Sequence, residues 1–124
     1  MRRLLAFVRV RRAATVTALC TASALGLAAT PAGAAARSCE PVVNPYPGTR
    51  YEGVDLTGIR ATNVSCTRAR RVARRAHYKA LGLTPPPSGI LRFTWKGWRV
   101  VGDLRGPSDR YVGSRGAMRV KWRF

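Results

Sequence analysis

The sequence predicts an α+β fold in which one helix packs on a three- or four-stranded antiparallel sheet and a disulfide ties an N-terminal arm to the body. Three observations predict it. Apolar residues recur at helical spacing between residues 65 and 82. Short segments between residues 90 and 124 are rich in aromatic and β-branched residues and are separated by glycine-containing turns. Two cysteines, Cys39 and Cys66, lie in the arm and at the start of the helix.

The beginning of the chain is typical of a secretory signal peptide. Arginines at positions 2, 3, 9, 11 and 12 precede an uncharged run over residues 13–29, and two small-residue cleavage sequences follow, Ala32-Gly33-Ala34 and Ala34-Ala35-Ala36. We therefore predict a signal peptide over residues 1–34, cleaved after Ala34 or Ala36, and a single small secreted domain over residues 37–124. The alternative is an uncleaved N-terminal anchor, but a transmembrane helix needs about 20 apolar residues and does not normally end in a cleavage sequence.

Two features of the leader suggest other export routes. Cys20 follows Thr17-Ala18-Leu19, which lacks the large aliphatic residue that a lipidation site has three places before its cysteine. Arginine pairs at positions 2–3 and 11–12 fit a twin-arginine signal loosely, and such pairs are frequent in a chain with 23 Lys and Arg residues. We favour general secretion.

The predicted mature domain is strongly basic. Five of the 23 Lys and Arg residues lie before residue 13, so 18 remain from Arg37 onward against the five acids of the chain, a difference of +13. Such a charge attracts anionic polymers and surfaces, and salt weakens the attraction. A codon bias toward arginine in a GC-rich genome explains the same composition without a partner, and both explanations stay open at this point.

The cysteines predict one disulfide. Cys20 leaves with the signal peptide, so Cys39 and Cys66 remain as a single possible pair in an exported chain, where disulfides persist. A loop of this length stabilises a fold by roughly 3–4 kcal/mol in the chain-entropy model. The alternatives are two free thiols or a metal site, but the chain has one histidine, His77, and no CxxC motif that would support a metal.

The segments before the helix contain many turn residues. Residues 38–50 have three prolines and a glycine, which predict an extended arm with turns. Residues 51–59 alternate roughly between apolar and polar side chains, interrupted by Gly53 and Gly58, and predict a short irregular strand. Cys39 is expected to hold the arm to the body.

The strongest local pattern predicts a helix. Ser65 occupies a typical N-cap position, and Gly82, followed by three prolines at 85–87, ends the segment. Its apolar stripe follows the spacing i, i+3, i+4, i+7 and i+11, with Ala69, Val72, Ala73, Ala76 and Ala80. The opposite face carries basic residues and no acid for i to i+4 pairing, which destabilises the helix and favours a use for those charges.

The remainder of the sheet is expected after the prolines. Strands are predicted at residues 90–104 (two short strands or one bulged strand), 111–114 and 118–124, with a turn at 106–109. Apolar and basic residues alternate throughout the last segment. Because side chains alternate between the two faces of a strand, Trp122 and Phe124 are expected to pack on the alanine stripe and the basic residues to lie on the outer face.

The sequence contains no recognisable catalytic pattern. His77 has no Cys, Ser or Asp at a recognisable spacing and is expected at the surface or its boundary. Five scattered carboxylates do not suggest the acid pair of a glycosidase, and no GxSxG, phosphate-loop or HExxH motif is present. The aromatic residues of the predicted sheet suit either stacking of bases or sugars or, more commonly, a small core. We therefore predict a protein that is not an enzyme and has no cofactor and no metal.

Residues 59–73 carry the pattern I-x-A-x-N-V-S-C-T-x-A-R-x-V-A. With a cysteine in the arm and a basic aromatic strand at the end, the chain resembles a small secreted domain common in actinobacteria. The resemblance implies export and the same arrangement of arm, helix and sheet, and it implies no activity. It also implies a second cysteine pair in the C-terminal sheet, at positions where this chain has Val100 or Val101 and Ser114, so that packing alone would hold this sheet.

These observations favour a non-catalytic binding module for an anionic partner, which is a cell-wall polymer, a nucleic acid or an acidic protein. The side chains expected to bind it are Arg68, Arg71, Arg75, Arg119, Lys121 and Arg123. They form one site only if helix and strand present them on the same face. The alternative is a secreted inhibitor or protein-interaction module acting through an exposed loop, at residues 84–88 or 106–110. A secreted nuclease suits the charge but would need a histidine and carboxylate pair, which the sequence does not show. No stable membrane insertion is expected after the signal peptide is cleaved.

Overall fold

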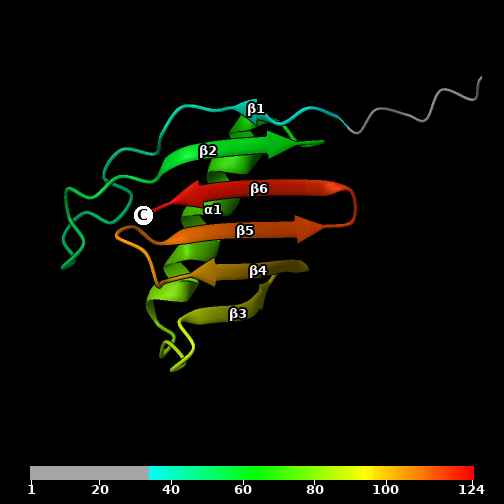
Figure 1. Cartoon of the computed structure of the whole chain (residues 1–124). Coiled ribbons are helices and arrows are strands. Elements are labelled where there is room, and N and C mark those ends of the chain that lie inside the picture. The colour runs from blue at the N-terminus through cyan, green and yellow to red at the C-terminus, as the bar shows by residue number, and fades with distance from the viewer. Residues whose placement is uncertain (1–33) are drawn as a thin grey trace, which may run out of the picture. The chain divides into compact units, whose positions relative to one another are not determined.

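Six antiparallel strands form a single sheet, and a helix crosses one of its faces (Figure 1). The computed structural model describes residues 34–124, so the predicted signal peptide, except its last residue, lies outside the described residues. In chain order the elements are β1 (Arg37–Ser38), β2 (Thr57–Thr62), α1 (Cys66–Leu81), β3 (Ile90–Trp95), β4 (Trp98–Asp103), β5 (Arg110–Arg115) and β6 (Met118–Arg123). The strands lie in the order β1-β2-β6-β5-β4-β3. The α+β class and the packing of one helix on an antiparallel sheet are as predicted.

The sheet has more strands than the three or four predicted. The arm contributes β1 at one edge, where Arg37 pairs with Ala61 of β2. Residues 90–104 form two separate strands joined by a tight turn. The strand expected at residues 51–59 lies further along the chain, at β2, because Gly53 adopts a φ of 80° and turns the backbone before it.

Helix α1 begins and ends where the sequence predicted. The hydroxyl of Ser65 accepts a hydrogen bond from the backbone N–H of Arg68 at 3.2 Å, which satisfies one free donor of the first turn. The chain leaves the helix at Gly82, whose φ of −88° is an ordinary right-handed value, so this end does not depend on the conformational freedom of glycine. The buried face consists of four alanines, a valine and His77. These mostly small side chains allow α1 to lie close to the sheet.

The apolar half of the last strand belongs to the core. Val120 and Trp122 of β6 are buried on the helix side of the sheet, and Phe124 is partly buried beside them. The ring of Trp122 stacks on that of Tyr111 in β5, with centroids 5.4 Å apart and planes 6° apart. Gly102 lies against the same tyrosine, and a Cβ atom there would be 2.5 Å from its ring, so this close approach requires glycine. The predicted packing of the last strand against the helix is confirmed.

Cys39 and Cys66 form the predicted disulfide, with 5.4 Å between their Cα atoms. The bond joins the arm to the first turn of α1. The arm is held further by the backbone N–H of Cys39, which donates to the carbonyl of Ile59 at 2.8 Å, and by a bridge between Val42 and Leu56. The covalent and backbone contacts together fix the arm along the edge of the sheet.

Candidate functional site

The face of the sheet that α1 leaves uncovered is strongly basic, and we call it the open sheet face. It looks toward the viewer in Figure 1, with α1 behind the strands. Seven exposed cations lie on it: Arg60 of β2, Arg92 of β3, Arg99 of β4, Arg110 of β5, and Arg119, Lys121 and Arg123 of β6. Their neighbours along the strands point toward the helix and form the core, so one alternation produces both the core and this basic face.

The strand register brings some of these cations directly opposite one another. Arg60 pairs with Lys121 between β2 and β6, and Arg110 pairs with Arg123 between β5 and β6. Side chains in directly opposite positions have Cβ atoms about 5 Å apart, and like charges there destabilise a sheet. Arg110 has an opposite charge on its other side, because Asp103 of β4 stands directly opposite it. At the Arg60–Lys121 pair the open sheet face carries charge repulsion that no acid of the strands offsets.

The strands hold one acid, Asp103, and it is already paired. Nε and Nη2 of Arg105 donate to its two carboxylate oxygens, each at 2.9 Å. These hydrogen bonds lower the pKa of Asp103 to about 2. This is the one salt bridge among residues 34–124, so none of the seven cations of the open sheet face has an ion pair there.

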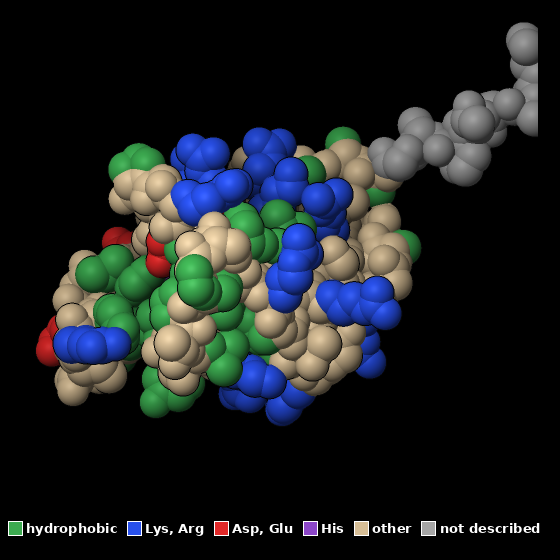
Figure 2. All heavy atoms as spheres, turned by 60° about the horizontal axis from the view of Figure 1, so that its bottom comes forward, with side chains coloured by type: hydrophobic (Ala, Val, Ile, Leu, Met, Phe, Trp, Pro, Cys, Tyr) green, Lys and Arg blue, Asp and Glu red, His purple; other side chains and the backbone are tan. Residues whose placement is uncertain are grey.

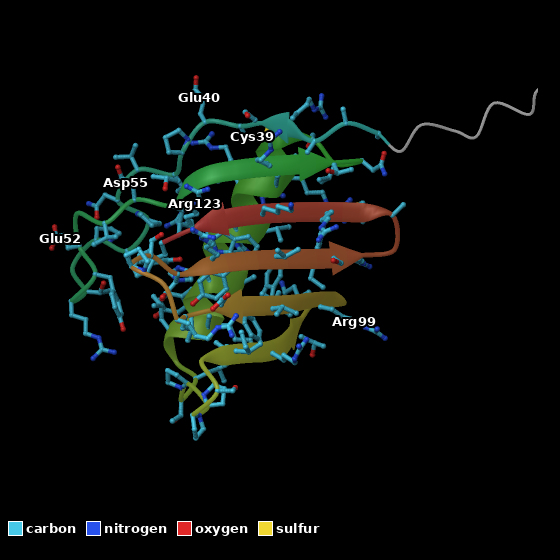
Figure 3. All side chains as sticks on the ribbon, viewed as in Figure 1. Cys39, Glu40, Glu52, Asp55, Arg99 and Arg123 are labelled. Atoms are coloured by element: carbon cyan, nitrogen blue, oxygen red, sulfur yellow. A yellow bond between two sulfur atoms is a disulfide. The ribbon has the colours of Figure 1, made fainter. Side chains whose placement is uncertain are left out.

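Three of the other four acids are gathered away from most of these cations, and the fourth, Asp109, directly precedes Arg110 of β5. Glu40, Glu52 and Asp55 come from the arm and the turns that follow it, at the opposite end of the domain from Arg99 (Figure 3). Asp55 has a local role, because its Oδ1 accepts a hydrogen bond from the backbone N–H of Asn44 at 2.8 Å. Figure 2, in which the open sheet face is turned upward, shows Lys and Arg side chains along that margin and acidic side chains at one end only.

Helix α1 carries a second set of cations on the other side of the sheet. Arg68, Arg71, Arg75 and Lys79 follow the spacing i, i+3, i+7 and i+11 and lie on the side of the helix that faces the β3–β4 hairpin. The Nζ atom of Lys79 donates to the carbonyl of Thr94 at 2.6 Å, which joins the helix to that hairpin.

The six cations predicted to bind an anionic partner therefore do not form one site. Three of them lie on α1 and three on the open sheet face: Arg68, Arg71 and Arg75 against Arg119, Lys121 and Arg123. The sheet separates the two sets, because the helix packs on the apolar half of β6 and the basic half points the other way. Each set has to be considered as a surface of its own.

Sequence reasoning missed four members of the open sheet face, namely Arg60, Arg92, Arg99 and Arg110. The signal was present for Arg92 and Arg99, which alternate with buried or partly buried residues in β3 and β4 as the basic residues of β6 do. Arg60 and Arg110 lie next to β6 because of the strand order, which cannot be predicted from a local sequence pattern.

His77 is fully buried, at 0% exposure, and the prediction of a surface position is wrong. It continues the apolar stripe one turn after Ala73, and its ring lies 5.0 Å from that of Tyr111 and 4.2 Å from that of Phe124. Its Nδ1 lies 2.8 Å from the hydroxyl of Tyr46. Burial lowers the pKa of His77 to about 4, so the ring is neutral at pH 7. A side chain in this position supports the core and does not reach a ligand at the surface.

The two loops considered for protein interaction are both anchored to the body. Residues 84–88 lead into a turn in which the N–H of Gly89 donates to the carbonyl of Pro86 at 2.9 Å, and the carbonyl of Gly89 accepts from the N–H of Leu104 at 2.9 Å. Residues 106–110 are held at one end by two backbone hydrogen bonds between Asp109 and Phe124, at 2.9 and 3.0 Å. Neither loop has as many charged side chains close together as the open sheet face.

No protein-family model, curated protein or solved structure matches this chain. The resemblance of residues 59–73 to a secreted actinobacterial domain stays a prediction. Within the described part of the chain, no three His, Cys, Asp or Glu side chains are grouped so that they could hold a metal ion. No helix among residues 34–124 is long and apolar enough to cross a membrane.

Proposed function

We propose that this protein is an exported, non-catalytic binding module that holds an extended anionic polymer on the open sheet face. The observation that carries the proposal is that seven exposed cations share this face while the one acid of the six strands is already paired. A surface that served solubility alone would be more stable with mixed charges, because opposite charges across a sheet attract and like charges repel. A bound polyanion would remove that repulsion.

The spacing of the cations suits a polymer with regularly repeated anionic groups. Neighbouring strands lie about 4.8 Å apart, and residues i and i+2 on one face of a strand lie roughly 7 Å apart. Arg119, Lys121 and Arg123 therefore form a row along β6, flanked by Arg60 and Arg110 on the two adjacent strands. Arginine binds phosphate or carboxylate oxygens in a bidentate manner, which suits a phosphate-containing cell-wall polymer or a nucleic acid.

Export is part of the proposal. The predicted signal peptide would deliver residues 37–124 to the outside of the cell, and a disulfide such as that between Cys39 and Cys66 persists in oxidising compartments. The partner is then expected in the cell wall or the medium. Mass spectrometry of the protein recovered from culture medium should find an N-terminus at Ala35 or Arg37, and a protein retained in the cytoplasm with Met1 in place would contradict export.

Two triple variants with the same loss of charge test the binding surface. One changes the open sheet face and the other changes α1: R119Q/K121Q/R123Q and R68Q/R71Q/R75Q. The probe is long-chain inorganic polyphosphate, and its affinity for the purified mature protein is measured by calorimetry between about 50 and 200 mM salt. The wild-type affinity should fall steeply as salt rises.

The sheet variant should bind polyphosphate at least about tenfold more weakly, and the slope of log K against log salt should fall by roughly one for each cation removed. The affinity of the helix variant for polyphosphate should fall by less than about threefold, since it has the same net charge as the sheet variant but an intact open sheet face. Equal losses in the two variants would mean that general charge and not this face binds the polymer. An affinity for polyphosphate that does not change with salt concentration would contradict the proposal altogether.

A further inference from the structure

A groove on the helix side of the sheet combines cations with a partly exposed tryptophan. Its first part is a hollow of about 330 Å³ between α1 and the turns of the β3–β4 and β5–β6 hairpins. Arg68 and Arg71 of α1, Lys96 of the β3–β4 turn and Arg115 at the end of β5 line it, and Trp95 forms part of its wall.

A second hollow, of about 560 Å³, shares Trp95 and Lys96 with the first and extends past Arg75 to Tyr78, which is 63% exposed. We call the two hollows together the helix groove. From Ser65, which lines the first hollow, to Tyr78 the helix rises about 20 Å at 1.5 Å per residue. The groove is therefore long enough for a short stretch of an extended polymer chain.

The lining of the helix groove offers hydrogen-bond donors and aromatic faces but no carboxylate and no amide side chain. The Arg, Lys and Trp side chains only donate. The hydroxyl groups of the lining, on Thr49, Ser65, Thr67 and Tyr78, can accept as well as donate. The excess of cationic donors suits a ligand rich in acceptor oxygens, such as a phosphate backbone.

Trp95 differs from the other tryptophans of the chain. Trp98 and Trp122 are 2% and 1% exposed and belong to the core, whereas Trp95 is partly exposed at the end of β3. The Nζ atom of the exposed Lys96 lies over its ring, 5.5 Å from the centre, so a base that stacks on this face takes the place of the lysine side chain. An aromatic ring bordered by cations is the arrangement on which the bases of single strands stack, because every base has a π-face and every nucleotide a phosphate.

We propose that the helix groove binds single-stranded nucleic acid, with a base stacked on Trp95 and the adjoining phosphates held by Arg68, Arg71 and Arg115. The groove lies on the helix side of the sheet, so this site is separate from the open sheet face. It distinguishes strands that have free bases from other polyanions. The open sheet face has no aromatic side chain and does not make that distinction.

Intrinsic fluorescence tests the stacking directly, because Trp95 is the one tryptophan of the chain that is not buried. An oligothymidylate of about ten nucleotides, within the site sizes known for such grooves, should quench the emission. An abasic strand of the same length has the same phosphates and no bases. It should bind several-fold more weakly and leave the emission unchanged.

Variants separate a lost stack from a damaged fold. In the R119Q/K121Q/R123Q background, which weakens the open sheet face, Trp95→Ala should weaken binding of a dye-labelled oligothymidylate, measured by anisotropy, by roughly tenfold or more, and should leave binding of the abasic strand unchanged. Trp95→Phe should keep part of the affinity. Arg71→Gln should weaken both strands, whereas Arg92→Gln, which removes the same charge from the open sheet face, should leave the base-dependent quenching intact.

Equal affinity for the thymidylate and abasic strands would overturn this inference, as would the absence of quenching. Quenching of the same size by heparin would assign the groove to an acidic glycan and would also overturn it. The outcome is independent of the open sheet face: R119Q/K121Q/R123Q should bind polyphosphate more weakly and still show thymidylate-dependent quenching.

Discussion

Acid should destabilise this protein through one buried side chain, His77. Its Nδ1 lies 2.8 Å from the hydroxyl of Tyr46, which also lies 3.0 Å from the carbonyl oxygen of Arg74. Both hydrogen bonds form when Nδ1 carries the proton of the neutral ring and the Tyr46 hydroxyl donates to the carbonyl. Nε2 then carries a lone pair and has no hydrogen-bond partner among the described residues. A second proton would place a charge there, among the rings of Tyr111 and Phe124.

The pKa of His77 determines the size of the effect. Burial lowers this pKa from 6.5 to about 4. The unfolded chain therefore takes up a proton at a higher pH than the folded chain does, so stability is lost as the pH falls from about 6.5 toward 4. Linkage with these values gives a loss of about 2.5 kcal/mol between about pH 7 and pH 4.5. That is a large part of the net stability of a small domain.

Urea unfolding followed by tryptophan fluorescence measures this loss at several pH values between about 7 and 4.5, with the disulfide kept oxidised. His77→Phe keeps a planar ring in the core and removes the titration. Other groups titrate in both proteins, including Asp109, whose pKa burial raises and which stabilises the fold as the pH falls. The difference between the two profiles therefore isolates His77. The wild type should lose about 2.5 kcal/mol more than the variant.

Parallel profiles for the two proteins would refute the reasoning, because acid sensitivity would then arise elsewhere. An NMR titration of the His77 ring with a midpoint near 6.5, the value of a free histidine, would refute it as well.

Three further predictions concern the fold. Replacing Cys39 and Cys66 with serine should lower the free energy of unfolding by about 3.5 kcal/mol in urea titrations, because a separation of 27 residues sets the loop entropy. Ser65→Ala should lower it by about 1 kcal/mol, because the first turn of α1 loses its cap. Gly102→Ala should lower it by about 1–3 kcal/mol, because the new Cβ would lie 2.5 Å from the ring of Tyr111.

Two substitutions at exposed positions are matched controls for Ser65→Ala and Gly102→Ala. Thr67→Ala removes a hydroxyl next to the cap, and Gly106→Ala adds a Cβ that meets nothing closer than 3.5 Å. Both should change the free energy of unfolding by less than about 0.5 kcal/mol. A control that lost as much as its partner variant would show that the cap, or the close approach to the tyrosine, is not the cause.

His77 illustrates why a correct pattern can still be read wrongly. The residue follows Ala73 by four positions and precedes Ala80 by three, so helix geometry places it on the buried stripe. Its polar type suggested the surface. The hydroxyl of Tyr46, which comes from the arm, satisfies one of its nitrogens, and no local pattern could have identified that partner.

For the cations of the open sheet face, too, the local pattern predicted only part of the arrangement. The alternation in β6 was enough to separate Arg119, Lys121 and Arg123 from the core. It could not show that Arg60 and Arg110 would stand directly opposite members of this row, since they come from strands β2 and β5.

The sequence by itself determined the start and end of α1, the side of the helix that is buried, the single disulfide and the two faces of the last strand. These features depend on residues a few positions apart, or on a pairing with one possibility, and so can be recognised locally. Only the tertiary structure decided the number and order of strands, the burial of His77 and the placement of the basic residues on two opposite surfaces. These depend on which distant segments hydrogen-bond to one another and on which face of the sheet the helix covers, and both are settled by packing of the whole chain.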